Sequence, residues 1–408
     1  MHGAGLTHPD FASLVTPLYV VERGKNEKNT VVPLFAQQRV IDPLASGDDR
    51  VSQLCERHSR RCLIVFKSHN KILLCIFAAM PAEIYNPFDN FNFSNRNCFL
   101  TGQVLNAGEE KIQVFPPWLM ERYKLHDQPF KLLDESMATY KDLKVPCAAQ
   151  INQTFLEPLE AEIAAAFDTG YEAVKKLDEL KLFQWAGKLL YGIIFNEIQS
   201  GIKLQHAQGE EFNISQSIIH KFSSLHLMLQ SINLPVVFED FKPYSFFLFK
   251  VDNNIGEFGY RDEINTLTFS LRIKDFGLII CLQDNGANKQ YHKDIFQKIE
   301  GEVLHPIQFE EFCARVFYSA YLFNRLPEYH TFPLDNDIYI EAEPLRGMSG
   351  KPLFDDWINK TYGQVLESFW KNWGILLFEI IKNPEKPMSF LFNADGSFIN
   401  GTTIELSH

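Results

Sequence analysis

The sequence predicts an α+β fold, because helical and extended patterns occupy separate stretches of the chain instead of alternating along it. From residue 156 onward, apolar residues recur every three or four positions, as in helices that bury one face. Residues 244–283 instead contain short apolar runs bounded by turn formers, which are typical of strands. A chain of 408 residues has room for roughly two to three structural units.

Residues 1–97 are expected to form a β-rich N-terminal region. Four apolar runs of strand length are separated there by chain-breaking residues, at positions 18–22, 30–35, 62–67 and 72–79. Residues 86–95 are rich in Asn and other turn formers, so we expect a long loop before the next part of the chain.

Residues 171–408 are expected to form a larger domain of helices packed on a sheet. The window 180–198 has the length of a membrane span, but polar and charged side chains interrupt it. We therefore expect a buried helix, in which Gly187 and Gly192 allow a neighbouring element to approach closely.

The apolar pattern of this domain also predicts further helices and strands. Helical stripes fall within residues 218–229, 309–323 and 362–380. Strands are expected at residues 244–251, 266–273, 276–283 and 337–343, with a turn at Asp284-Asn285-Gly286. Helices, strands and then helices again do not make regular βαβ units, which favours the α+β class.

Charge and cysteine usage restrict the classes of partner and the compartment. The 39 Lys and Arg residues are outnumbered by 51 Asp and Glu, and a net charge of −12 disfavours non-specific nucleic-acid binding. Seven scattered cysteines fit reduced thiols better than a disulfide framework. We expect a cytoplasmic protein without signal peptide or membrane association, and its specific partners stay unknown.

Three ordered fragments stand out within residues 98–160: Cys98-Phe-Leu-Thr-Gly102, Val114-Phe-Pro-Pro-Trp-Leu119 and Val145-Pro-Cys-Ala-Ala-Gln-Ile-Asn152. A helix is expected to follow, with an acid and a proline near its start at Glu157 and Pro158. This order resembles the HNH endonuclease-like proteins. Their module opens with Cys-x-x-Cys-Gly, continues with Glu-His-Val-Phe-Pro and closes with Cys-x-x-Cys-Asn before a helix.

The resemblance implies a ββα module over residues 98–170. It further implies a structural zinc held by two Cys-x-x-Cys pairs, since four thiolates close a tetrahedral zinc site. In the family a His acts as general base on the water that attacks a phosphodiester, beside a second, catalytic divalent cation. An imidazole is suited to accept that proton near neutral pH.

This chain departs from the family at the zinc positions. Cys98 matches the first zinc cysteine, but Thr101, Ala148 and Ile151 stand where the other three belong. Cys147 lies one place too early to restore the spacing. We therefore expect no zinc and no other cofactor here, with the former site filled by packing around these side chains.

The chain also departs from the family at the catalytic positions. Gln113 stands where the His belongs, and an amide has no nitrogen that accepts a proton at physiological pH. The retained Asn152 is expected to serve as a turn or a helix cap. We therefore expect no catalytic residue in this module. We call the module degenerate because its zinc ligands and its catalytic base are replaced.

The leading hypothesis is a pseudoenzyme, a non-catalytic protein derived from HNH nucleases with a binding or scaffold role. One alternative is an enzyme of another class that uses a pocket in the C-terminal α+β part, which would require converging His, Asp or Cys side chains. Another is a nuclease with a relocated metal site, which would require acidic residues near Asn152.

Two clusters near the N-terminus offer further candidates. Arg57, Arg60 and Arg61 are candidate phosphate-binding residues, although such clusters are more often solvated surface. Cys55 and Cys62 flank a histidine at helical spacing, but no nearby fourth zinc ligand accompanies them, so we interpret this stretch as one face of a helix.

Overall fold

The computed structural model describes residues 65–68, 71–74 and 84–406, except for positions 107–110, 135, 210–211, 255–256, 348–349 and 405. The first two segments, β1 (Val65–Ser68) and β2 (Lys71–Leu74), form an antiparallel pair and belong to a separate compact unit. They overlap two of the four strands expected near the N-terminus. The other two expected strands lie outside the described residues.

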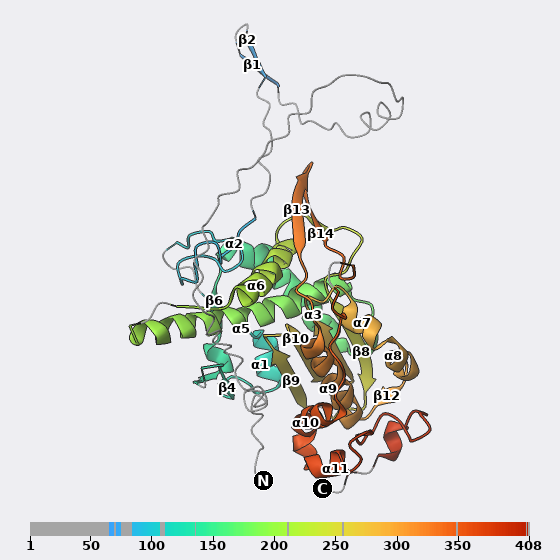
Figure 1. Ribbon diagram of the computed structural model, residues 1–408. Helices are drawn as coiled ribbons and strands as arrows, with labels where there is room; N and C mark the ends of the chain where they lie inside the picture. The colour runs from blue at the N-terminus through green and yellow to red at the C-terminus, as the bar shows by residue number, and fades with distance from the viewer. Residues whose placement is uncertain are drawn as a thin grey trace, which may run out of the picture. The chain divides into compact units, whose positions relative to one another are not determined.

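The remaining described residues form one compact unit of the predicted α+β class, with a five-stranded sheet at its centre (Figure 1). The strand order is β12-β8-β11-β10-β9, antiparallel except for the pairing of β12 with β8. These strands are β8 (Ser245–Val251), β9 (Phe258–Glu263), β10 (Thr268–Ile273), β11 (Phe276–Cys281) and β12 (Val303–Leu304). The strands predicted at 244–251, 266–273 and 276–283 are thereby confirmed, whereas β9 was not predicted.

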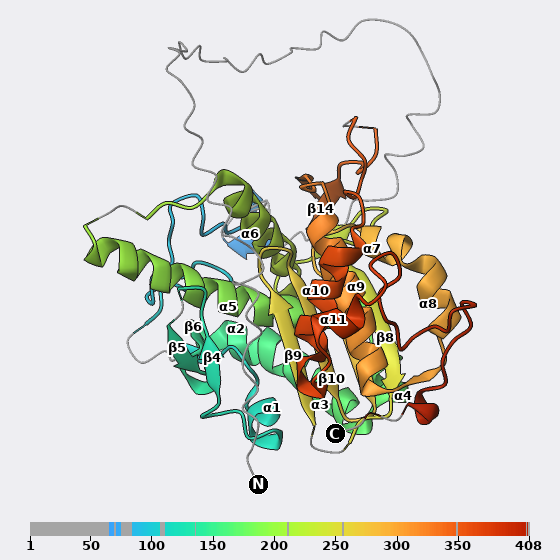
Figure 2. The ribbon, with the colours of Figure 1, turned by 60° about the horizontal axis from the view of Figure 1, so that its bottom comes forward.

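Helices cover both faces of this sheet, as Figure 2 shows. Alternate residues of β11 therefore enter different cores: Leu278 packs with one group of helices, and Ile279 packs with the other. Every residue of β10 and β11 is buried, because neither face meets solvent.

The first helical layer consists of α3 (Glu157–Thr169), α5 (Glu179–Ala207) and α6 (Gln216–Leu229). The predicted buried helix is confirmed in α5, which begins where the Asp178 carboxylate accepts the Leu180 N–H. A Cβ atom at Gly187 would lie 2.8 Å from Leu229 of α6, so the predicted close approach is also confirmed. No helix in the described part of the chain is long and apolar enough to cross a bilayer.

The second layer consists of α9 (Pro306–Leu322) and α10 (Asn359–Trp370), with the short α11 (Leu377–Ile380) beside them. The stripe predicted within 309–323 is buried along α9, which packs so closely that a Cβ at Gly277 would lie 2.3 Å from the Phe309 ring. The remaining short helices are α4 (Tyr171–Val174), α7 (Ala287–Tyr291) and α8 (Lys293–Ile299).

Residues 84–170 precede these layers and contain short elements. Residues 86–95 form the expected loop of turns. Two antiparallel pairs follow, β3 with β6 and β4 with β5. The elements are β3 (Lys111–Gln113), α1 (Pro117–Arg122), β4 (Pro129–Lys131), β5 (Met137–Thr139), β6 (Lys144–Pro146) and α2 (Ala149–Ile151).

The helix expected to begin near Glu157 begins earlier than predicted. A continuous helical run starts at α2, passes through a π-helical turn at Asn152–Leu156 and continues as α3 to Gly170. Pro158 lacks the N–H that would bond the carbonyl four residues before it. The wider π turn accommodates this missing bond, so the proline lies within the helical run instead of at its start.

A separate three-stranded sheet contains β13 (Tyr329–Leu334) and β14 (Asp337–Ala342), whose hairpin projects from this unit (Figure 1). β14 also pairs in parallel with β7 (Val236–Phe238), which follows α6. The strand predicted at 337–343 is therefore confirmed.

Candidate functional site

The turn at residues 98–102 places Cys98 beside the end of β6. The Gly102 N–H donates to the Cys98 carbonyl at 2.8 Å, and the Phe99 N–H donates to the Pro146 carbonyl at the same distance. Gly102 has a φ of +70°, and a Cβ atom there would lie 2.4 Å from the Tyr85 ring, so the turn requires glycine. The turn is thereby joined to β6 next to Cys147.

Cys98 and Cys147 form a buried thiol pair. Both are free and almost completely buried, and their side chains are hydrogen-bonded to each other. The Thr101 hydroxyl and the backbone of Ala148 and Leu100 also bond the Cys98 sulfur. Chiefly through the Cys147 bond, these partners lower the pKa of Cys98 to about 5, although burial opposes the shift.

Three positions expected at the former zinc site therefore meet in space: Cys98, Thr101 and Ala148. Cys147 joins them although its spacing does not fit the zinc pattern. Ala148 is fully buried, and Ile151 packs partly buried against the main core. Within the part of the chain that the structure describes, no three His, Cys, Asp or Glu side chains gather as metal ligands would.

The two amides at the catalytic positions bond to protein atoms. With its amide nitrogen facing the chain before β6, Gln113 donates to the Lys141 carbonyl at 3.1 Å and the Leu143 carbonyl at 3.3 Å. Asn152 donates to the Glu157 carboxylate at 2.7 Å. Asn152 lies where α2 ends and the π-helical turn begins, inside the continuous helical run and not at its start.

The other expected site residues fall outside the described residues. These are Arg57, Arg60 and Arg61, the candidate phosphate ligands, and the neighbouring Cys55 and Cys62.

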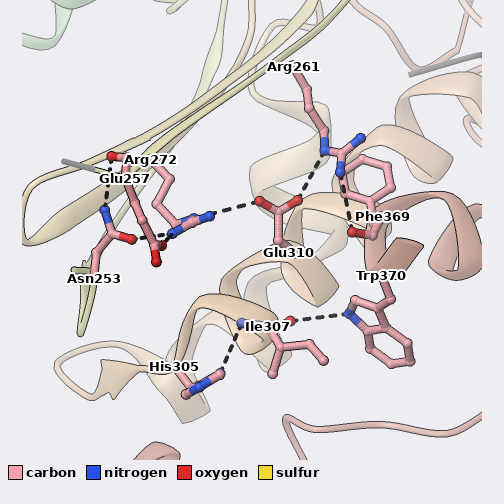
Figure 3. Close-up of polar contacts among 9 residues, drawn as sticks. All are labelled: Asn253, Glu257, Arg261, Arg272, His305, Ile307, Glu310, Phe369 and Trp370. Atoms are coloured by element: carbon pink, nitrogen blue, oxygen red, sulfur yellow. Dashed lines mark hydrogen bonds and ion pairs between the residues drawn. The ribbon is translucent and has the colours of Figure 1, made fainter. Parts of the chain in front are cut away.

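A cluster of charged side chains joins the central sheet to the second helical layer (Figure 3). Arg261 of β9 donates to Glu310 of α9 at 3.1 Å, and its guanidinium lies 4.3 Å from the centre of the Phe369 ring. Arg272 of β10 lies between Glu310 and Glu257, with N···O distances of 3.7 and 2.8 Å. Two cations and two anions balance here, so the cluster fixes α9 and α10 on the sheet without leaving a free charge.

A buried serine and histidine lie in contact but do not form a nucleophile and its base. His292 Nε2 is 2.8 Å from the Ser319 hydroxyl, which also lies 2.5 Å from the side-chain amide oxygen of Asn288 and 2.9 Å from the Val316 carbonyl oxygen. Asn288 in turn bonds Asp284, which also accepts the Ser245 hydroxyl at 2.6 Å. Burial lowers the pKa of His292 to about 3. The polar groups of this chain of residues are thus bonded to one another, as in structural networks.

Two neighbouring cavities lie between α6 and the segment that follows α9, and Lys221, Phe323 and Arg325 line both of them. We refer to them together as the pocket. Its outer cavity has a volume of about 280 Å³ and is also lined by Ser217 and Ile218 of α6. Its inner cavity, of about 30 Å³, is lined by Cys281, Gln283 and Asp284 at the end of the central sheet. Sequence reasoning did not single out any residue of this pocket except Asp284, which was expected only as a turn residue.

Comparison of the chain with protein-family models, curated proteins and solved structures gives no match.

Proposed function

We propose that this chain is a non-catalytic relative of HNH-type nucleases and acts by binding. The supporting observation is the arrangement of residues 98–170: β3 and β6 pair in antiparallel fashion, with α1, β4 and β5 inserted between them, and the helical run from α2 to α3 follows β6 as the helix of a ββα module would. The fragments that resemble the family lie at the turn, the strands and the helix start of this arrangement.

The chemistry of phosphodiester hydrolysis argues against catalysis by this module. A general base must have a free lone pair within reach of the attacking water. The side chain of Gln113 instead donates to two backbone carbonyls, and Asn152 is bonded to Glu157. A single carboxylate beside Asn152 is also fewer than the several oxygen ligands by which a protein usually holds a catalytic divalent cation.

The pocket beside α6 favours binding over chemistry of another class. The inner part contains one thiol and one carboxyl group, Cys281 and Asp284. Burial raises the pKa of both, and Asp284 is bonded to Ser245 and Asn288. A thiol with a raised pKa is a poor nucleophile, and a carboxylate that already holds four hydrogen bonds is a poor base.

We predict that the purified full-length chain does not cleave plasmid or single-stranded DNA in the presence of Mg²⁺, Mn²⁺, Ni²⁺ or Zn²⁺. The reason is the absence of a base at Gln113 and of a ligand set for the metal. The measurement is gel analysis of the DNA beside the Gln113→Ala and Asn152→Ala variants, which should match the unaltered chain.

Cleavage that is lost in either variant would contradict the proposal. The same preparation provides an independent reading by elemental analysis: one tightly held zinc per chain, lost on Cys98→Ala, would show that the zinc site has survived and would also contradict it.

A further inference from the structure

The outer pocket beside α6 carries two cations and no acidic side chain. Lys221 extends from α6 on one wall, and Arg325 lies on the opposite wall. Ser217 and Ile218 belong to the first turn of α6, where the Ile218 N–H is bonded to Ser215 and the Ser217 N–H has no partner within the helix. Cations and the N-terminal end of a helix both favour a negatively charged group in the space between them.

Glu263 lies close enough to Lys221 to favour its charged form, whereas the contacts of Arg325 are with backbone carbonyls. The ammonium group of Lys221 donates to the Asn265 carbonyl, and burial lowers the pKa of this lysine. Arg325 is held by backbone carbonyls, among them those of Leu345 at 3.2 Å and Asn324 at 2.6 Å. These bonds fix the guanidinium in place without cancelling its charge.

The inner end of the pocket presents an unused amide. Gln283 is 6% exposed, and neither its amide oxygen nor its amide nitrogen has a hydrogen-bond partner among the described residues. Most buried amides are paired, and leaving one unpaired destabilises the folded state. The adjacent space of about 30 Å³ has room for one polar group. The side-chain amide of glutamine both donates, through its NH2 group, and accepts, through its oxygen, so it fits a group that can do both.

We propose that this pocket binds a small phosphate monoester, with the phosphate between Lys221, Arg325 and the first turn of α6, and a polar group of the ester at Gln283. The inference rests on the proposed binding role. Phosphate is favoured over other anions because its oxygens can bond the lysine and the helix N–H groups together. The volume of about 280 Å³ limits the ligand to roughly the size of a mononucleotide.

The test is isothermal titration calorimetry of the full-length chain with inorganic phosphate and with nucleoside 5′-monophosphates. Both should bind, and at least one monophosphate should bind more tightly than inorganic phosphate. Lys221→Met should weaken binding of both by about tenfold, since it removes a charge-assisted bond. The control Lys203→Met removes an exposed cation outside the pocket and should leave both affinities unchanged.

Gln283→Leu tests the inner end of the pocket independently of the proposed phosphate site. It should weaken the monophosphate and leave inorganic phosphate unchanged, while a thermal melt without ligand should show a protein at least as stable as the unaltered chain. A purely structural glutamine would give a loss of stability instead.

Three results would overturn the inference: no binding of any phosphate compound, equal weakening by Lys203→Met and Lys221→Met, or equal binding of succinate. None of them bears on DNA cleavage, so failure here and failure of the proposed function can be told apart.

Discussion

His226 lies where α6 meets the turn at residues 98–102. Its Nε2 is 2.9 Å from the Phe99 carbonyl oxygen, and its ring contacts Tyr191 at a centroid distance of 4.9 Å. The side chain is fully buried, and this burial lowers the pKa of His226 to about 4. The neutral imidazole is therefore the form that the folded protein accepts.

This shift predicts a loss of stability in mild acid. The folded form stays neutral down to a pH of about 4, whereas an unfolded histidine takes up a proton below a pH of about 6.5. The contribution of the buried, neutral His226 to the free energy of unfolding is therefore full above about pH 6.5 and is lost as the pH falls toward 4. Between about pH 7.5 and 5.5, the free energy of unfolding of the unaltered chain should fall by about 1.4 kcal/mol more than that of His226→Gln.

Urea unfolding at the two pH values measures this difference. His206→Gln is the matched control, because His206 is exposed at the end of α5, and it should leave the pH dependence unchanged. His292, whose pKa is lowered to about 3, also causes a loss of stability as the pH falls. This loss occurs equally in both variants, because both retain His292. An identical pH dependence in the unaltered chain and in His226→Gln would refute the assignment.

Single residues were the least predictable level from sequence. The Cys-x-x-Cys spacing gave Cys147 no role. Spacing along the chain does not show that a backbone hydrogen bond joins β6 to the turn at residues 98–102 and so brings Cys147 beside Cys98. Lys221, Gln283 and Arg325 likewise carry no local motif and come together only through the fold. The difference of Thr101 and Gln113 from the cysteine and histidine of the HNH pattern, by contrast, could be read from the sequence alone.

At the scale of elements, α5 is positioned by its glycines. A Cβ atom at Gly192 would lie 2.9 Å from both Cγ atoms of Val114, which directly follows β3. We predict that Gly192→Ala destabilises the protein by about 1–2 kcal/mol, because overpacking outweighs the better helix propensity of alanine. The free energy of unfolding from urea titration is the quantity to measure.

The double variant provides the control. In a Val114→Ala background the obstructing methyl groups are gone, so the same glycine change should become stabilising through helix propensity alone. A Gly192→Ala effect of the same sign and size in both backgrounds would show that Val114 does not limit the approach.

Elements with one clear periodicity were predictable from sequence, and mixed ones were not. β11 is a continuous apolar run and β10 alternates polar and apolar residues, and both were expected. β9 was missed because Arg261 and Asp262 interrupt its apolar pattern, and only the fold supplies Glu310 as a partner for the arginine. The start of the run from α2 was missed because Pro158 is usually found at a helix start, whereas here a π turn accommodates it.

At the scale of the whole molecule, residues 98–170 share one core with the domain that follows them. Phe115 packs against Tyr260 of β9 at a centroid distance of 5.2 Å, and Phe167 packs against Phe276 of β11 at 5.0 Å. The Tyr171 N–H donates to Asp275 at 2.9 Å, directly after α3. The stretch therefore has no hydrophobic core separate from the sheet and α5.

This shared core can replace a structural metal. Zinc contributes on the order of 10 kcal/mol to the folding of small zinc modules. Full burial of one large apolar side chain contributes roughly 1.5 to 3 kcal/mol, so about five such residues have a comparable effect. More than five in this stretch are buried, among them Phe115, Leu119, Leu156, Ile163 and Phe167.

We therefore predict that the isolated fragment 98–170 does not fold, with or without zinc. Its buried side chains would lose the sheet and α5. The Phe99 carbonyl would lose His226 of α6, and the Leu100 carbonyl would lose Gln230, which directly follows α6. A circular dichroism melt of the fragment should show no cooperative transition, whereas the full-length chain should show one. A cooperative, metal-independent transition in the fragment would mean that the stretch is autonomous and that packing against the rest of the chain does not replace the metal.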